Sequence, residues 1–183
     1  MKKFELTSET KINIFGKKLF RIKALVSFGV VKTGETGGWV EKEENVNQSG
    51  DAWVFGNAEV FGNARVSGDA RVFDNAMVSG NARVSGDARV FDNAEVSGNA
   101  EVSGNAEVSG NADYTTIHGF GTQFRTTTFF RCKDKQVKVS CGCFYGTIPE
   151  FREQVKNTRD GKIAEEYLMI ADLMEKHFAE EAK

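Results

Sequence analysis

The chain has 183 residues, of which 40% are hydrophobic and 27% are charged, and its formal net charge is −2. A chain of this size can bury a core and form one or two domains, and its acidic balance argues against a nucleic-acid partner. It shows no signal peptide and no apolar run long enough to span a bilayer, and its three cysteines do not suit a disulfide framework. We therefore expect a cytoplasmic protein with no membrane partner.

Residues 1–45 are not repetitive and are expected to form an N-terminal β cap. Residues 11–15 and 19–26 read as two short strands around Gly16, which predicts a hairpin. A repeat structure that starts after residue 45 would expose an unpaired strand edge on its first coil. The expected role of this segment is to cover that edge.

Residues 46–117 repeat one six-residue phrase: Ala-x-Val, then Ser or Phe, Gly or Asp, and Asn or Asp. Valine recurs at every sixth position from Val54 to Val108, and Tyr114 takes the next place. Val46 and Gln48 stand in degenerate Ala and Val positions, which makes twelve hexapeptides. So strict a period indicates a solenoid, in which each unit buries its apolar side against its neighbours.

A second period defines the cross-section of this solenoid. Phe55, Phe73 and Phe91 are eighteen residues apart, so three hexapeptides make one turn of a triangular coil and the repeat has four turns. Within each phrase Ala and Val lie two residues apart and point to the same side of a strand. We expect these small residues to fill a narrow core.

The phrase resembles the hexapeptide repeat of left-handed parallel β-helices, and the left-handed sense comes from this resemblance alone. The segment before it is similar to the start of YdcK-like hexapeptide proteins of bacteria and phages. The matching residues are Leu-Phe-Arg-Ile-Lys-Ala-Leu at 19–25, Gly34, Gly-Gly-Trp-Val-Glu at 37–41, and Asn45. The resemblance implies an architecture and no activity.

Outward aromatic residues gather on the predicted solenoid. Trp53, Phe55, Phe73 and Phe91 share one face and Phe61 lies on a second, whereas the third face is polar. An aromatic stack on a coil whose core is already filled needs a cover. The terminal helices could fold back over it, or it could be a homo-oligomer interface; related β-helices commonly form trimers, which makes the trimer the favoured state.

The corners carry columns of Asp and Asn. Asn57, Asn75, Asn93 and Asn111 predict a structural amide ladder. Asp51, Asp69 and Asp87 could bind cations, but no repeat has the nonapeptide calcium pattern. Neutralisation of the Asp column by Arg65 and Arg83 is the alternative.

Residues 118–183 differ in composition and predict a small α+β unit of ββαα order. Two β-rich runs, 124–132 and 136–145, form a hairpin. Thr147 then caps a helix that runs to about residue 157, and a second helix from residue 160 carries an apolar stripe. The stripe is Ile163, Tyr167, Ile170, Met174 and Phe178. The unit resembles a domain of uncharacterised phage and prophage proteins, through Thr-Phe-Phe-Arg at 128–131, Cys-Gly-Cys-Phe-Tyr-Gly at 141–146 and residues 166–174.

Acyl transfer is the enzymatic alternative, because many left-handed β-helices are acyltransferases that use acyl-CoA. Such enzymes need a histidine base on a coil, yet residues 46–117 contain none. His118 follows the last coil and would have to serve across a subunit boundary. The repeats also lack a loop that would shape an acceptor pocket.

The C-terminal unit holds the other candidate site residues. Cys132, Cys141 and Cys143 with His118 could be a zinc site, but buried thiols, with Cys132 and Cys141 as cross-strand neighbours, explain them more simply. Arg125, Thr127, Arg131 and His118 form the candidate ligand site, since arginines beside hydroxyls and aromatics suit a phosphate-bearing ligand. Thr and Phe are also ordinary strand residues.

The sequence as a whole predicts a mainly β, non-catalytic scaffold without a cofactor. Its solenoid would display a C-terminal binding domain, as a homo-oligomer. The phage-like resemblance implies an accessory role, including antagonism of host defence. Either a host protein or a small nucleotide-like ligand would be the partner.

Overall fold

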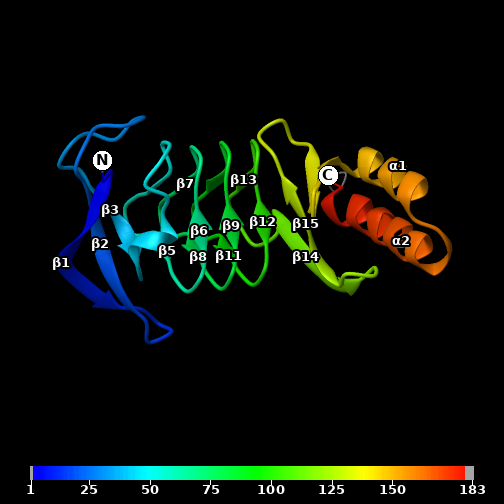
Figure 1. Cartoon of the computed structure of the whole chain (residues 1–183), viewed down its shortest axis with the longest axis horizontal. Coiled ribbons are helices and arrows are strands. Elements are labelled where there is room, and N and C mark those ends of the chain that lie inside the picture. Colours follow the sequence, from blue (N-terminus) through cyan, green and yellow to red (C-terminus); the bar gives the residue numbers. More distant parts are fainter. Residues whose placement is uncertain (1, 180–183) are drawn as a thin grey trace.

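The computed structural model describes residues 2–179, which form an elongated stack along one axis (Figure 1). A β hairpin lies at the N-terminal end, the solenoid in the middle, and a second sheet with two helices at the C-terminal end. The mainly β architecture, the three-sided solenoid and the two C-terminal helices predicted from the sequence are confirmed. The left-handed sense stays a prediction.

The solenoid consists of two-residue strands that pair in parallel with the strand eighteen residues further along the chain. One sheet has the order β4-β7-β10-β13, another β6-β9-β12, and the third continues from β5 through β8 to β11. Every valine and alanine of these strands and of the residues before them is buried. The strands are Trp53–Val54 (β4), Glu59–Val60 (β5), Arg65–Val66 (β6), Arg71–Val72 (β7), Met77–Val78 (β8), Arg83–Val84 (β9), Arg89–Val90 (β10), Glu95–Val96 (β11), Glu101–Val102 (β12) and Glu107–Val108 (β13).

The first coil begins earlier than the sequence predicts. Strand β3 (Thr36–Val40), expected in the cap, pairs in parallel with β5, and Val40 lies opposite Val60. Val46 lies opposite Val66, so it takes a Val position, and the assignment of that position to Gln48 is wrong. These pairs are twenty residues apart because the first coil carries two extra residues between Val46 and Val54. The solenoid still has four turns, which now run from Val40 to Val108.

The corners show why aspartate replaces glycine in one column, at Asp74 and Asp92, and not in another. A Cβ on Gly68 would lie 2.9 Å from the backbone nitrogen of Gly86, so this column admits only glycine. At Gly56 the nearest atom would be 4.0 Å away, and Asp74 takes the next place in that column with a φ of 58°. Aspartate tolerates this left-handed conformation better than most residues.

Amide ladders stabilise two corner columns. The predicted column begins with a bond of 3.4 Å from Asn57 Nδ2 to Asn75 Oδ1. A second column, overlooked in the sequence, has bonds of 3.2 Å from Asn63 to Asn81 and 3.0 Å from Asn81 to Asn99. In the Asp column the Asp51 amide donates to Asp69 Oδ1 at 3.1 Å.

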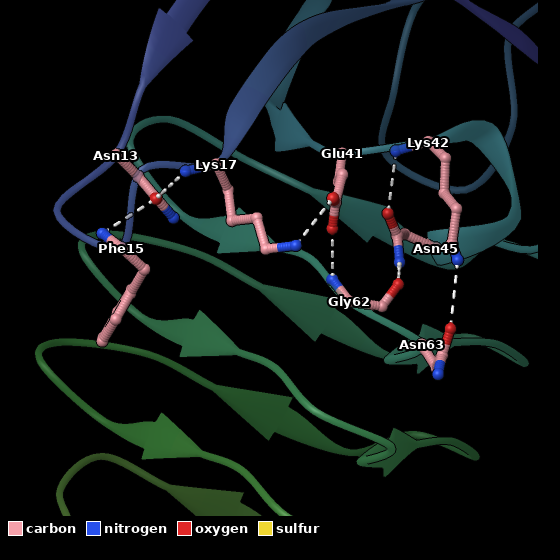
Figure 2. A network of polar contacts seen from close by, with 8 residues as sticks. All are labelled: Asn13, Phe15, Lys17, Glu41, Lys42, Asn45, Gly62 and Asn63. Carbon is pink, nitrogen blue, oxygen red and sulfur yellow. Dashed lines mark hydrogen bonds and ion pairs between the residues drawn. The ribbon is translucent and has the colours of Figure 1, made fainter.

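The N-terminal cap is an antiparallel pair, β1 (Phe4–Ile12) and β2 (Lys18–Ala24), and β2 continues the sheet onto β3. This confirms a hairpin around Gly16, but the first strand, predicted at residues 11–15, ends at Ile12, because Asn13 Oδ1 accepts the N–H groups of Phe15 and Lys17 and turns the chain. Figure 2 shows how the cap joins the first coils. Glu41 accepts the Gly62 N–H at 2.6 Å and pairs with Lys17 at 3.3 Å, contacts that hold its pKa below the usual value.

The C-terminal unit has four antiparallel strands rather than two. They are β14 (Tyr114–Phe120), β15 (Arg125–Arg131), β16 (Val137–Cys141) and β17 (Phe144–Thr147). Tyr114, counted above as the last repeat, pairs instead with Phe130 on β15. The predicted run 136–145 is two strands because Gly142, at a φ of 64°, turns the chain within it.

This sheet closes the last coil of the solenoid. Tyr114 Oη donates to Glu95 O at 2.7 Å and accepts the Ser97 N–H. The tyrosine hydroxyl thus makes the hydrogen bonds that a further parallel strand beside β11 would make. On the β12 side, the Glu101 N–H donates to Thr128 Oγ1 at 3.0 Å. Each contact satisfies a backbone group that an open edge would leave unpaired. The C-terminal unit is therefore a cap as well as a candidate binding module.

Helices α1 (Ile148–Thr158) and α2 (Gly161–Phe178) pack on the other side of the sheet. Thr147 accepts from the Glu150 N–H and Glu150 accepts from the Thr147 N–H, which confirms the predicted capping box. Tyr167, Ile170, Met174 and Phe178 are buried along α2, as its apolar stripe predicts. The helices extend away from the solenoid and do not cover its aromatic face (Figure 1).

Candidate functional site

Strand β15 sends alternate side chains to opposite sides, as predicted. Phe129 packs against Phe151 of α1 with ring centroids 6.1 Å apart. Phe130 belongs to the core of the solenoid and its neighbour Thr128 contacts β12. The side of β15 that carries Arg125 therefore faces the helices.

The structure does not bring the four candidate ligand residues into one site. Arg131 lies six residues from Arg125, about 20 Å along a strand. Its Nε lies 3.5 Å from Asp113 and its Nη2 donates to Phe178 O at 3.0 Å, so it joins the solenoid end to α2. Thr127 is buried and donates to Cys141 Sγ. Arg131 and Thr127 thus have structural partners.

His118 lies exposed on β14. Its Nδ1 is 3.4 Å from Thr126 Oγ1, and it lines none of the larger hollows among residues 2–179. A general base acts within hydrogen-bond reach of a bound substrate. Among residues 2–179, none of these hollows places a bound molecule beside His118.

Arg125 lines a pocket of about 160 Å³ between the sheet and the helices. We call it the Arg125–Arg159 pocket. Four segments form it: the β14–β15 turn, the β16–β17 turn, helix α1 with Arg159 after it, and Tyr167 of α2. Its lining is Gly121, Thr122, Gln123, Arg125, Cys141, Cys143, Phe144, Phe151, Gln154, Val155, Thr158, Arg159 and Tyr167.

Local geometry places the two arginines. A Cβ at Gly142 would collide with Arg125 Nη1, so the glycine leaves room for the guanidinium. Arg159 ends α1, where its N–H donates to Val155 O at 2.8 Å and its Nη1 to Thr158 O at 2.8 Å. Phe124 holds a φ of 47° and exposes 64% of its surface beside Arg125. Such strain in a non-glycine residue often marks a functional turn.

The pocket is basic at its mouth and apolar inside. Neither Arg125 nor Arg159 takes part in an ion pair among residues 2–179. The Phe144 and Phe151 rings lie 5.4 Å apart with their planes tilted by 53°, and Phe151 meets Tyr167 edge to face at 5.8 Å. Burial raises the pKa of Tyr167, whose hydroxyl donates to Phe120 O. The arrangement can bind an anion attached to an apolar or aromatic group.

The cysteines do not form the zinc site considered above. Cys132 pairs with the end of the solenoid at Ala106, whereas Cys141 lies opposite Thr127 at the far end of β15. The expectation that Cys132 and Cys141 are cross-strand neighbours is therefore wrong. Residues 2–179 contain no group of three or more metal-ligating His, Cys, Asp or Glu side chains.

Thiol alkylation at neutral pH should distinguish these cysteines. Burial raises the pKa of Cys132 to about 11, so its reactive thiolate is scarce, whereas Cys143 is exposed. We expect iodoacetamide to label Cys143 first and Cys132 only after unfolding, as read by peptide mass spectrometry. Equal labelling rates for the two thiols in the folded protein would contradict this placement.

The aromatic residues of the solenoid divide into two groups. Trp53 is fully buried under Phe4 and Phe28 of the N-terminal segment, and Phe61 is buried with Leu19, Trp39 and Met77. Phe55, Phe73 and Phe91 stay half-buried, and the last two rings stack in parallel at 5.0 Å. The N-terminal cap, rather than the helices, provides the cover. We name the three remaining residues the aromatic column.

These features define a β-solenoid repeat protein that is closed by a sheet at both ends. The YdcK Beta solenoid repeat family matches residues 70–86 and 82–98, so the middle of the chain carries a YdcK-like repeat. No curated protein matches the chain. Neither α1 nor α2, the helices of the described part of the chain, is both long and apolar enough to cross a membrane.

Proposed function

We propose that this protein is a non-catalytic scaffold whose C-terminal module binds a small phosphate-bearing, nucleotide-like ligand. The observation that carries the proposal is the presence of Arg125 and Arg159, from different elements, in one pocket without a carboxylate partner. Guanidinium groups match phosphate geometry and bind it with charge-assisted hydrogen bonds.

The dimensions of the pocket support this class of ligand. A neighbouring hollow of about 610 Å³ shares Thr122, Gln123, Arg125, Thr158 and Arg159 with it, and its remaining lining residues are Asp160 and Ile163. The two together fall within the range of small-molecule sites, about 300–1,000 Å³. Phosphate would lie between the guanidinium groups, and Phe144 and Tyr167 would line the space for a base or another flat group.

Calorimetry with the full-length protein and a panel of ribonucleotides tests this proposal. We expect saturable binding of at least one nucleotide, and a loss of about 100-fold in affinity for Arg125→Gln/Arg159→Gln, since each charge-assisted bond contributes about 1.5–3 kcal/mol. Lys133→Gln/Lys135→Gln removes equal charge at the other end of the sheet and should leave binding unchanged. Equal losses in both variants would contradict a local site.

Acyl transfer is the alternative activity, and it has a direct test. If acyl-CoA binds and His118→Ala abolishes transfer to an acceptor, the non-catalytic proposal fails. We expect neither result, because His118 is exposed on β14 and does not line the Arg125–Arg159 pocket.

We also propose that the aromatic column is a homo-oligomer interface, with a trimer as the favoured state. The support is the half-exposed state of Phe55, Phe73 and Phe91, of which the last two stack, on a face that the N-terminal cap leaves uncovered. Phe73→Glu/Phe91→Glu should give a monomer in light scattering, whereas wild type should not. Ser79→Glu/Ser97→Glu, on the neighbouring face, is the control. A monomeric wild type would refute the interface.

The biological setting that we propose is the cytoplasm of a bacterial host. The C-terminal resemblance to phage and prophage proteins supports an accessory role there, including antagonism of host defence by sequestering a nucleotide signal or by binding a host protein. Pull-downs from a bacterial lysate that recover a partner, but no nucleotide, would favour the second route.

A further inference from the structure

A second hollow lies on the polar side of the solenoid, far from the Arg125–Arg159 pocket in sequence. It has a volume of about 650 Å³ and lies over strands β6 and β9. Arg65 and Ser67 of one coil and Arg83 and Ser85 of the next line its floor. We call this hollow the arginine cleft.

The cleft exists because the first coil departs from the repeat. Helix η1 (Glu43–Asn45) and the two extra residues after Val46 widen that coil, and they form one wall of the cleft. Buried Asn45 fixes this wall: it accepts the Lys42 N–H at 2.9 Å and donates to Gly62 O at 3.2 Å and to Ala64 O (Figure 2). The wall is therefore held by the fold rather than by a free loop.

The floor of the cleft concentrates positive charge. Arg65 and Arg83 lie directly opposite each other on neighbouring parallel strands, and both side chains are exposed. The backbones of such strands are about 4.8 Å apart. Like charges in this position repel. Neither arginine takes part in an ion pair among residues 2–179, so the structure gives no support to neutralisation of the Asp column by them.

Acidic residues limit the size of this positive surface. Glu101 follows Arg83 in the same column, where it accepts from Ser140 Oγ at 3.1 Å. Glu43 and Glu44 lie on the opposite wall, and Glu43 pairs with Lys2. An extended polyanion would meet these carboxylates on two sides. The footprint suits one anionic group.

We propose that the arginine cleft binds a single phosphate group of a small phosphorylated molecule. The two guanidinium groups donate to its oxygens, and the hydroxyls of Ser67 and Ser85 lie beside them on the same floor. Binding removes the repulsion between Arg65 and Arg83. This site is independent of the Arg125–Arg159 pocket and does not require the function proposed for it.

Backbone-amide NMR of the full-length protein, titrated with inorganic phosphate at constant ionic strength, tests the proposal. We expect saturable shifts at Ser67 and Ser85 that equivalent sodium chloride does not produce. Because resonances report by position, binding at Arg125 and Arg159 would be seen separately. Absent or non-saturating shifts at the two serines would overturn the proposal.

Two matched variants sharpen this test. Arg65→Gln/Arg83→Gln should weaken phosphate binding at the cleft at least about tenfold, without lowering the melting temperature, because the side chains are exposed. Arg71→Gln/Arg89→Gln removes two arginines with the same register on the neighbouring face and should leave the shifts unchanged. Equal weakening in both variants would mean that only net charge matters and would overturn the site.

Discussion

Val78→Asp is expected to unfold the solenoid. Val78 is fully buried and lies in register between Val60 of β5 and Val96 of β11, so it is covered by a coil on either side. A carboxylate there would have no partner, which costs several kcal/mol or forces its protonation. Domains are stable by only about 5–15 kcal/mol, so most of that stability would be lost. Urea unfolding followed by circular dichroism measures the effect.

Met77→Asp is the control for this prediction. Met77 precedes Val78 on the same strand but points outward and is half-exposed. We expect it to cost about 1–2 kcal/mol, clearly less than Val78→Asp, because Met77 packs in part against Trp39 and Phe61 but a carboxylate there stays in contact with water. Similar losses in the two variants would contradict the alternation of inward and outward residues on which the whole solenoid depends.

Trp53→Ala is expected to destabilise the N-terminal end by about 3–5 kcal/mol, the usual cost of removing a buried aromatic ring. Its ring is fully buried beneath Phe4 and Phe28. Because repeat structures are held by nearest-neighbour contacts, the loss should concentrate in β1, β2 and β3. Hydrogen exchange should show faster exchange in these strands than in β10–β13.

Phe91→Ala is the control for Trp53→Ala, because Phe91 belongs to the aromatic column and the N-terminal cap does not cover it. Phe91 lies in the same sheet but is half-exposed, so its removal should cost clearly less stability than the removal of Trp53. If Phe91→Ala destabilises the chain as much as Trp53→Ala, then Trp53 does not have the special role assigned to it as the anchor of the cap.

The strict period made most of the solenoid predictable. Because Val and Ala recur every six residues without an insertion from Val54 to Val108, the three outward faces follow from counting alone. The observed register, in which Arg71 lies beside Arg89 and Arg65 beside Arg83, is the predicted one. A fixed spacing is a local signal, and it needs no knowledge of distant contacts.

The first coil could not be found in the same way. Val40 and Val46 keep the six-residue spacing, but the next valine is eight residues away, at Val54. The two extra residues shift the register and hide the coil from a search for one period. Together with η1, which Asn45 holds in place, they also form the wall of the arginine cleft. The signal that could have revealed the coil is the Trp-Val pair at 39–40, which repeats at 53–54.

The candidate site was predicted in part for a related reason. Arg125 was found because an arginine beside threonines and aromatics is visible in a short segment. Arg159 was not, because it joins the pocket only when α1 folds across the sheet and its C-terminal end meets the β14–β15 turn. Arg131 shares the local pattern of Arg125, yet its side chain serves Asp113 and Phe178. Local composition does not distinguish these roles.

Native mass spectrometry of the full-length protein after incubation with ribonucleotides shows whether the Arg125–Arg159 pocket binds a nucleotide. We expect an added mass of one nucleotide per chain in the wild type, and its loss in Arg125→Gln/Arg159→Gln but not in Lys133→Gln/Lys135→Gln. If the wild-type protein binds no nucleotide at nucleotide concentrations up to about 1 mM, the proposed site is contradicted. A Kd above that concentration corresponds to a binding free energy weaker than about 4 kcal/mol.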